Sequence, residues 1–281
     1  MFLSQLFVNT GRGADHPGSQ WIRNVYRVHQ RLWMAFPDSK ARADDPFFLG
    51  PWSIPESQGA KPTRDRAGFL FRIESDGAPR ILVQSVQRPD WDYAFQNAPY
   101  LLSGPPNLRE FNPTPKSGQA YRFRLLANVI RSKSVAQAGG TMRKARPIPR
   151  RKRTEELIAP VALPAAMPTE PAERERLLRE RWDPWRRWLQ RMGEGRGFRV
   201  LDEGPSPLLM QAVHCVVQNP RRGDGNNGHG AREKRYNAGL FNGTLICTSP
   251  GELRSAIVNG VGHAKAFGFG LLSVAPVGDD N

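Results

Sequence analysis

The alternation of apolar and polar residues predicts two successive sets of strands and helices along this chain. Short alternating runs indicate half-buried strands, and apolar residues at helical spacing indicate amphipathic helices. The first set comprises a strand at 2–9, a helix at 19–36, strands at 68–74 and 80–85, and a short helix within 89–102. Asp76-Gly77 between the middle strands is a hairpin turn signal. This order is typical of an α+β fold with helices on one face of an antiparallel sheet.

The second half repeats strand, helix, hairpin, helix and strand. Its predicted strands are 120–131, 197–201, 209–218, 236–247 and 271–277, and its predicted helices are 173–192 and 249–258. We expect Asp183-Pro184 to restart the first helix, and Ser249 and Glu252 to form a capping box at the second. Prolines in 104–118 should prevent a ladder or a helix. The sequence therefore predicts an α+β protein of two tandem ferredoxin-like βαββαβ domains, 1–103 and 119–281, joined by a linker at 104–118.

The helix at 19–36 divides into three sectors when its residues are wound at roughly 100° per step. Ser19 is a plausible N-cap, and Pro37 disfavours helical geometry just before it. The apolar arc consists of Ile22, Val25, Val28, Leu32 and Phe36. Three arginines share the far side: Arg23, Arg27 and Arg31. The seam between them carries Tyr26, His29 and Trp33.

This helix sequence contains no carboxylate, so the arginines have no internal partner. An acid–base group at the edge of unpaired guanidinium groups suits a phosphodiester. From the helix alone the structural alternative is favoured, because a histidine on an apolar face is usually a hydrogen-bonded core residue and a basic stripe is usually solvated.

The formal net charge of +15 and the pI near 10.7 favour a polyanionic partner, with nucleic acid the leading class. A membrane-surface protein is the alternative, but the sequence has neither a long apolar run nor a signal-peptide pattern, so we expect a cytoplasmic protein. Cys215 and Cys247 make no metal-binding spacing, and we expect buried thiols in a reducing compartment.

The segment 132–171 is the most strongly biased part of the chain. Basic residues crowd its first half between prolines: Arg143, Lys144, Arg146, Arg150, Arg151, Lys152 and Arg153. Such a segment cannot bury itself, which predicts an arm that is disordered or ordered by RNA. A solubilising loop without RNA contacts is the second possibility, and the sequence leaves both open.

A glycine-rich connection between the last helix and the last strand places Gly260, Gly262, Gly268 and Gly270 around Lys265. Glycine lets the backbone approach a ligand closely and point successive amides at an anion. The spacing fits neither a nucleotide P-loop nor a Rossmann turn. By itself, such a connection is weak evidence for a ligand.

Five stretches of the sequence carry a family resemblance. They are MFLSQLFVN, YRVHQRLW before FP, FLFRIE with ILVQS and PDW, YRFRLLAN, and GVGHAKAFGFGLLSVAP. In this order they resemble the CasE family, the repeat-cleaving endoribonucleases of type I-E CRISPR Cascade complexes. The stretches 38–66, 132–180 and 219–235 read as insertions. The resemblance implies two ferredoxin-like, RRM-like domains that bind the stem-loop of a CRISPR repeat.

The resemblance further implies metal-independent cleavage at the base of the stem, leaving a 2′,3′-cyclic phosphate and a 5′-hydroxyl, by a subunit that retains the crRNA within Cascade. By position, His29 is the catalytic histidine and Tyr26 its partner. Imidazole can serve as base or acid in such a reaction. The second proton carrier is unassigned, with His263 as a candidate. The expected RNA contacts come from the helix arginines, the basic arm and the glycine loop.

No metal or other cofactor is expected, because the carboxylate pairs Asp44-Asp45 and Glu155-Glu156 fall in the expected insertions. The competing interpretation is a non-catalytic double RRM-like RNA-binding module in which His29 is idle. RRM-type proteins read single strands through exposed aromatic residues on the sheet. The predicted strands here offer mainly aliphatic and arginine residues, which favours a duplex stem as the ligand.

Overall fold

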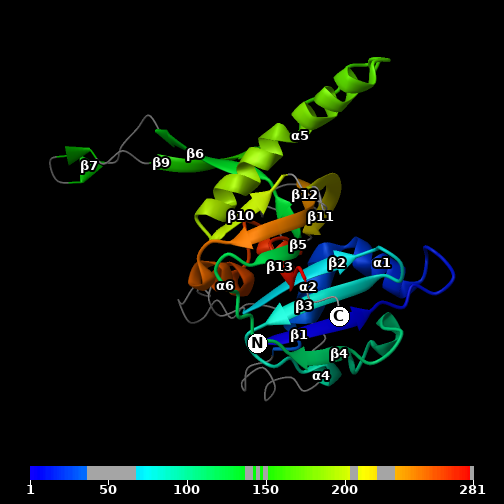
Figure 1. The fold of residues 1–281 in the computed structure, drawn as a ribbon. Helices are drawn as coiled ribbons and strands as arrows, with labels where there is room; N and C mark the ends of the chain where they lie inside the picture. Colours follow the sequence, from blue (N-terminus) through cyan, green and yellow to red (C-terminus); the bar gives the residue numbers. More distant parts are fainter. Residues whose placement is uncertain are drawn as a thin grey trace.

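The computed structural model describes residues 1–36, 68–136, 142–143, 146–147, 151–202, 208–219 and 232–278. These residues form two large antiparallel sheets, each with helices packed on one face, and two small two-stranded sheets (Figure 1). The predicted α+β fold of two ferredoxin-like units is confirmed.

The first unit contains a four-stranded sheet with the order β2-β3-β1-β4. Its strands are β1 (Phe2–Phe7), β2 (Phe69–Glu74), β3 (Arg80–Ser85) and β4 (Asn107–Glu110). Its helices are α1 (Pro17–Arg23), α2 (Val25–Trp33), α4 (Trp91–Phe95) and the 3-10 turn η2 (Pro99–Leu101). Apolar residues of α2 and of the strands share one core that includes Leu6, Val28, Leu32, Phe71, Ile81 and Val83.

The predicted single helix at 19–36 is two helices that meet at Asn24. The Asn24 backbone leaves helical geometry, and its side-chain oxygen accepts a hydrogen bond from the Arg27 amide at 3.2 Å, which caps α2. Asparagine offers this local alternative to helical hydrogen bonding, and the sequence pattern did not register it. Ser19 is not an N-cap, since α1 begins at Pro17 and His16 Nδ1 accepts from the Gly18 amide.

The stretch 104–118 is not free of pairing. It contains β4, which pairs with β1 in antiparallel register from Phe2 opposite Glu110 to Gln5 opposite Asn107. A sheet-edge strand needs only one partner, so the flanking prolines do not prevent it. The division into 1–103, a linker and 119–281 stays a proposal, and β4 favours moving the end of the first domain beyond Glu110.

The second unit has the strand order β10-β12-β5-β13, with β11 also paired to β12. Its strands are β5 (Ala120–Asn128), β10 (Phe198–Leu201), β11 (Leu209–Asn219), β12 (Arg232–Cys247) and β13 (Leu272–Pro276). Its helices are α5 (Pro171–Glu194), α6 (Pro250–Asn259) and the 3-10 turn η3 (Lys265–Phe267). Because β10 and β11 pair with opposite ends of β12, they act as one interrupted edge strand.

Two predicted helix details in this unit are wrong. Helix α5 does not restart at Asp183-Pro184 but continues through the proline, because Trp185, Trp188 and Leu189 anchor the following turns in the core. Helix α6 forms as predicted, yet the Ser249 side chain makes no capping hydrogen bond, and Pro250 occupies the first helical position instead.

The basic segment after β5 is partly an ordered ribbon rather than a disordered arm. Strand β6 (Ile130–Ala136) pairs with β9 (Arg151–Leu157), and the short strands β7 (Met142–Arg143) and β8 (Arg146–Pro147) pair with each other. Figure 1 shows this ribbon reaching away from both sheets. Backbone pairing needs no buried side chains, so a charged sequence can form it.

Candidate active site and nucleic-acid interface

His29 lies on α2 inside an aromatic cage. Its ring stacks on Phe69 with centroids 5.5 Å apart and on Phe71 at 6.1 Å, and it meets Trp33 edge-on at 5.7 Å. Its Nδ1 atom is buried and has no hydrogen-bond partner among the described residues. A core histidine of the ordinary kind would have such a partner. Packing against aromatic rings, and not a hydrogen bond from Nδ1 to a described residue, therefore holds the His29 ring.

Burial lowers the pKa of His29 from 6.5 to about 4, because the apolar cage disfavours the charged imidazolium. The ring is therefore neutral at pH 7. A neutral imidazole has a free lone pair with which to accept a proton, which is the state that a general base requires.

Tyr26 lies one turn before His29 and faces the second unit. It is half-buried and packs against the cluster of Tyr236, Ala238 and Phe269, which comes from β12 and the glycine-rich connection. The helix that carries His29 is therefore held from both sides, by its own sheet and by the second unit.

The glycine-rich connection adopts backbone conformations that require its glycines. Gly260, Gly262, Gly268 and Gly270 all have φ between 75° and 87°. A Cβ atom on Gly260 would lie 2.8 Å from the Gly270 oxygen, and one on Gly270 would lie 2.7 Å from the Val261 oxygen. The Val261 amide donates to the Gly270 oxygen at 2.8 Å, which closes the loop at its base. Backbone crowding at this closure excludes any side chain.

The tip of this loop rests on the cage of His29. A Cβ atom on Gly268 would lie 3.2 Å from the Phe71 ring, whose face stacks on His29. Phe267 packs against the core of the first unit and against Tyr236, with ring centroids 5.4 Å apart. The structure thus brings together α2 and the loop, which are more than 200 residues apart in the sequence.

Lys265 and His263 hold different positions in the loop. The Lys265 ammonium donates to the Asn259 carbonyl at the end of α6. His263 is exposed, and its backbone pairs with Asn128 of β5. Between them, Ala264 has a φ of 60°, the one positive value among the described residues other than glycine. Such a left-handed alanine stores strain at the centre of the loop.

The predicted arginine stripe is broken. Arg23 ends α1, whereas Arg27 lies on α2, and both side chains are exposed. Arg31 differs from these two, because its side chain is half-buried and its Nη1 donates to the Ala94 carbonyl of α4 at 3.0 Å. Burial lowers the pKa of Arg31, which matches a guanidinium that fastens two helices rather than one that meets phosphate.

The basic arm is only partly described. Arg143 lies in β7, Arg146 in β8, and β9 contains Arg151, Lys152 and Arg153. Lys144 and Arg150 lie outside the described residues. Arg131 and Glu156 pair across the ribbon at 2.9 Å, so part of the charge is neutralised internally.

The described residues contain neither a candidate membrane-spanning helix nor a candidate metal site. Within the described ranges, no helix is both long and apolar enough to cross a membrane. Among those same residues, no three histidine, cysteine, aspartate or glutamate side chains gather closely enough to hold a metal ion. Asp44 and Asp45 lie outside the described residues.

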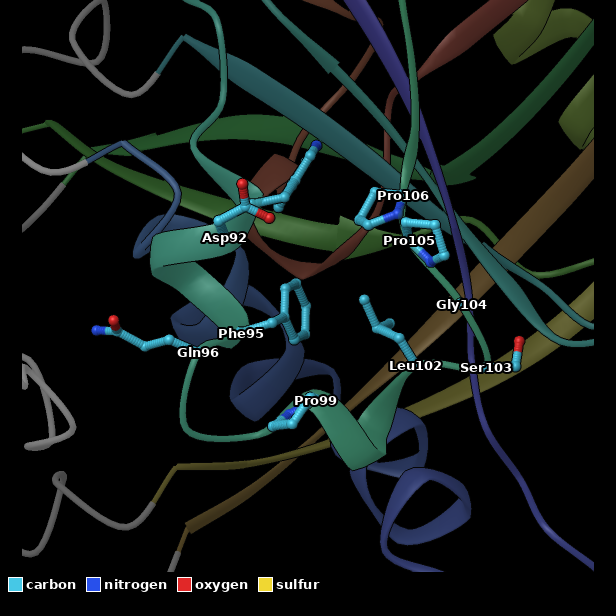
Figure 2. Close-up of a pocket in the computed structure, with 10 residues that line it drawn as sticks. Asp92, Phe95, Gln96, Pro99, Leu102, Ser103, Gly104, Pro105 and Pro106 are labelled. Atoms are coloured by element: carbon cyan, nitrogen blue, oxygen red, sulfur yellow. The ribbon is translucent and has the colours of Figure 1, made fainter.

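A hollow of about 540 Å³ opens between α4 and the segment leading to β4 (Figure 2). Phe95 and Leu102 point into it, and Pro99, Pro105 and Pro106 line it. None of the predicted site residues contributes to its wall, so this hollow is separate from the candidate site.

The outer face of the first sheet is covered by the second unit. Leu70 touches Gly260, and the Gln84 side chain donates to the Ile257 carbonyl of α6 at 2.6 Å. Arg72 donates to the Leu271 carbonyl at 3.0 Å. An RRM-type protein reads bases on this face. Here protein occupies these positions, which disfavours single-strand reading by the first sheet.

The sequence pattern did not identify Phe69, Phe71 or Arg72 as parts of the site. Each lies in β2, where it reads as an ordinary strand residue. The alternation of β2 held the available signal, because it puts the phenylalanines on the side of α2 and the arginine on the opposite face.

Comparison with known proteins extends over the whole described fold. A family model described as CRISPR associated protein matches residues 1–276. The CRISPR-associated endoribonuclease Cse3 of Thermus thermophilus is 28% identical over 278 residues, covering 98% of this chain and 100% of the relative. The Cascade subunit CasE of Escherichia coli is 24% identical over 266 residues, covering 92% and 94% respectively. A solved structure of Cse3 bound to a 19-nucleotide RNA aligns with a TM-score of 0.59 and 26% identity, over 98% of this chain and 100% of that one.

Proposed function

Because this chain belongs to the CasE family of CRISPR-associated proteins, we propose that it cuts the repeat hairpins of precursor CRISPR RNA as an endoribonuclease. The cut falls at the base of the stem, and the protein keeps the product as a subunit of a type I-E Cascade complex. The partners are then the repeat RNA and the other Cascade subunits, in the cytoplasm.

One observation carries the catalytic part of this proposal. His29 is neutral, has an unpartnered Nδ1 among the described residues, and lies in the cage on which the glycine loop rests. A neutral base beside a glycine-rich loop, of which His263 and Ala266 are exposed, suits attack on a phosphodiester.

The reaction needs no cofactor in its bond changes. The neutral His29 imidazole takes the proton of the ribose 2′-hydroxyl as the 2′-oxygen attacks phosphorus. The bond between phosphorus and the 5′-oxygen breaks, and this oxygen takes a proton from a second donor, leaving a 2′,3′-cyclic phosphate and a 5′-hydroxyl. His263 stays the candidate for that second donor. Tyr26 orients the ribose or phosphate.

RNA binding is assigned to residues that remain accessible. Arg23 and Arg27 are exposed on the α1–α2 surface, and we keep them as phosphate contacts. Of the four loop glycines only Gly262 stays accessible, because Gly260, Gly268 and Gly270 are buried. The basic ribbon is kept on its charge alone. Arg31 is withdrawn from this set, because its guanidinium is already bonded to Ala94. The Lys265 ammonium donates to the Asn259 carbonyl and so stabilises the loop. Lys265 contacts phosphate only when RNA replaces this hydrogen bond.

The competing function is a double RRM-like binding module without catalysis. The covered face of the first sheet and the unpartnered His29 nitrogen both weigh against it. A binding module has no need for a desolvated histidine.

The decisive test is cleavage of a cognate repeat hairpin in excess EDTA, compared with the same hairpin carrying a single 2′-deoxy nucleotide at the scissile position. We expect cutting of the first RNA, no cutting of the second, and similar affinity for both. Cleavage that strictly requires added Mg²⁺, or that tolerates the 2′-deoxy position, would reject the mechanism. Binding of both RNAs without any cutting would favour the binding module.

A further inference from the structure

We propose that Arg72 is a positioning residue that holds the glycine loop of the second unit against the catalytic cage of the first. The inference rests on the proposed function, since it concerns how the two halves of that site are kept together. It assigns to Arg72 no contact with RNA.

Arg72 is a buried arginine whose guanidinium bonds to both units. The residue is 2% exposed. Within its own strand, Nε and Nη2 donate to Glu74 Oε1 at 3.1 and 2.7 Å. Toward the second unit, Nη1 donates to the carbonyls of Arg124 and Leu271, and Nη2 donates to the Ser273 hydroxyl. A planar guanidinium can satisfy this many acceptors at fixed angles, which a lysine cannot.

Two of the three acceptors in the second unit lie at the stem of the glycine loop, and the third, the Arg124 carbonyl, lies on the neighbouring strand β5. Leu271 follows Gly270 directly, and Ser273 is two residues further along β13. Gly270 is itself tied by its amide to the Leu126 carbonyl of β5 at 2.7 Å. Arg72 therefore fixes the point at which the loop leaves the sheet.

The other side of the same strand carries the cage. Phe71 precedes Arg72 and points to the opposite face, where it stacks on His29 and lies against Gly268. Strand β2 thus contacts the loop at its stem through Arg72 and at its tip through Phe71, and Leu70 adds an apolar contact with Gly260. A shift of β2 relative to β13 would change the distance between His29 and the loop backbone.

Glu74 locks the guanidinium in place. Burial raises the pKa of Glu74, but hydrogen bonds from Arg72 and Arg80 outweigh this and hold the pKa below its usual value. Arg80 of β3 donates to Glu74 Oε2 at 2.8 Å. Arg80 thus contacts the same carboxylate as Arg72. The hydrogen bond described for the Arg80 side chain, however, has its partner in the first unit. Arg80 is a matched control.

The experiment compares Arg72→Met with Arg80→Met in single-turnover cleavage, RNA affinity and amide hydrogen exchange. Misplacement of reacting groups by about 1 Å can cost about 100-fold in rate. We expect Arg72→Met to cut about 10- to 100-fold more slowly with affinity within about threefold of the parent, and Arg80→Met to stay within about threefold in both. Arg72→Lys, which can reach one or two of the acceptors, should fall between them.

Hydrogen exchange tests the same idea without activity. In the RNA-free protein, peptides covering 260–272 should exchange at least about tenfold faster in Arg72→Met, and at the parental rate in Arg80→Met. If Arg72→Met does not fold, Arg72→Lys carries the test, because it keeps a positive charge beside Glu74 and leaves the Glu74 contacts with Arg80 and Arg124 in place. Peptides covering 260–272 should then exchange faster than in the parent, and at the parental rate in Arg80→Met.

Parental cleavage and parental loop exchange in a folded Arg72→Met protein would overturn the inference. Equal losses in Arg72→Met and Arg80→Met would overturn it as well, because the effect would then belong to the Glu74 cluster. His29→Ala measured in parallel separates the two proposals. If it cuts at full speed, the proposed mechanism fails, while the exchange result still decides the role of Arg72.

Discussion

The two ferredoxin-like units share a strand order but contribute different kinds of chemistry. The first unit is compact, with a nine-residue helix α2 across its sheet, and it supplies side chains: His29, Tyr26 and the cage. The second unit carries the 24-residue helix α5, the ribbon and an interrupted edge strand, and it supplies backbone through the glycine loop. Because the loop tip rests on Phe71, the proposed reaction centre draws on both units. A duplicated fold can therefore divide one site between a side-chain half and a main-chain half.

The largest effect should come from the side-chain half. Loss of a general base costs about 10²–10⁴-fold in rate, so His29→Ala should cut at least about a hundredfold more slowly while binding the hairpin with nearly parental affinity. Tyr26→Phe should lose less, because its ring still packs on Tyr236 and Phe269. Single-turnover time courses and gel-shift titrations on the same preparations measure both.

Two other results for His29→Ala would argue against a catalytic role for His29. If His29→Ala melts several degrees lower and loses binding and cutting together, His29 is a structural residue. Full-speed cleavage by a folded variant removes it from the mechanism.

The second prediction sharpens the status of His29 through pH. The pKa near 4 in the folded protein lies below the usual 6.5, so between these values the unfolded chain binds more protons. The contribution of the neutral His29 to the free energy of unfolding is therefore fully present above pH 6.5 and is lost as the pH falls toward 4. Between pH 7 and pH 4 the loss should approach about 3 kcal/mol.

The reference for this measurement is His29→Phe, which keeps an aromatic ring in the cage but cannot titrate. Denaturant unfolding at several pH values should show the parent losing up to about 3 kcal/mol more than the variant. Carboxylates such as Glu74 titrate in both proteins and cancel. Parallel stability curves would mean that His29 is not desolvated in solution.

The smallest predicted effect tests the main-chain half. In Gly262→Ala the new Cβ atom would have no neighbour closer than 3.6 Å, so only the φ of 86° opposes the substitution. We expect it to lower the free energy of unfolding by about 1 kcal/mol. Gly270→Ala has nearly the same φ but meets the Val261 oxygen at 2.7 Å. It should destabilise by about 1–2 kcal/mol more, since the loop closure must open. Equal free energies of unfolding for the two variants would show that close backbone approach is not what the loop requires.

Much of the fold follows from local pattern. Strand β3 has the predicted bounds, and β2, β10, β13 and α6 lie within a residue or two of theirs. Alternation and helical spacing act over a few residues, so they predict such elements well. Local exceptions caused the misses. Asn24 caps a new helix, core tryptophans carry α5 through Pro184, and β4 pairs despite its prolines.

The candidate site divides in the same way. The sequence by itself determined which residues were candidates for the chemistry. These are His29, which has no carboxylate in its helix, Tyr26 one turn away, and a cluster of glycines, a residue type that allows backbone conformations closed to other residues. Tertiary structure alone decided their states. Burial by Phe69 and Phe71 makes His29 neutral, and the Ala94 carbonyl takes Arg31 out of the basic surface. Arg72 and Gly268 join the two units across long sequence separations. Desolvation and contacts between distant strands depend on the packed chain, and no short stretch of sequence encodes them.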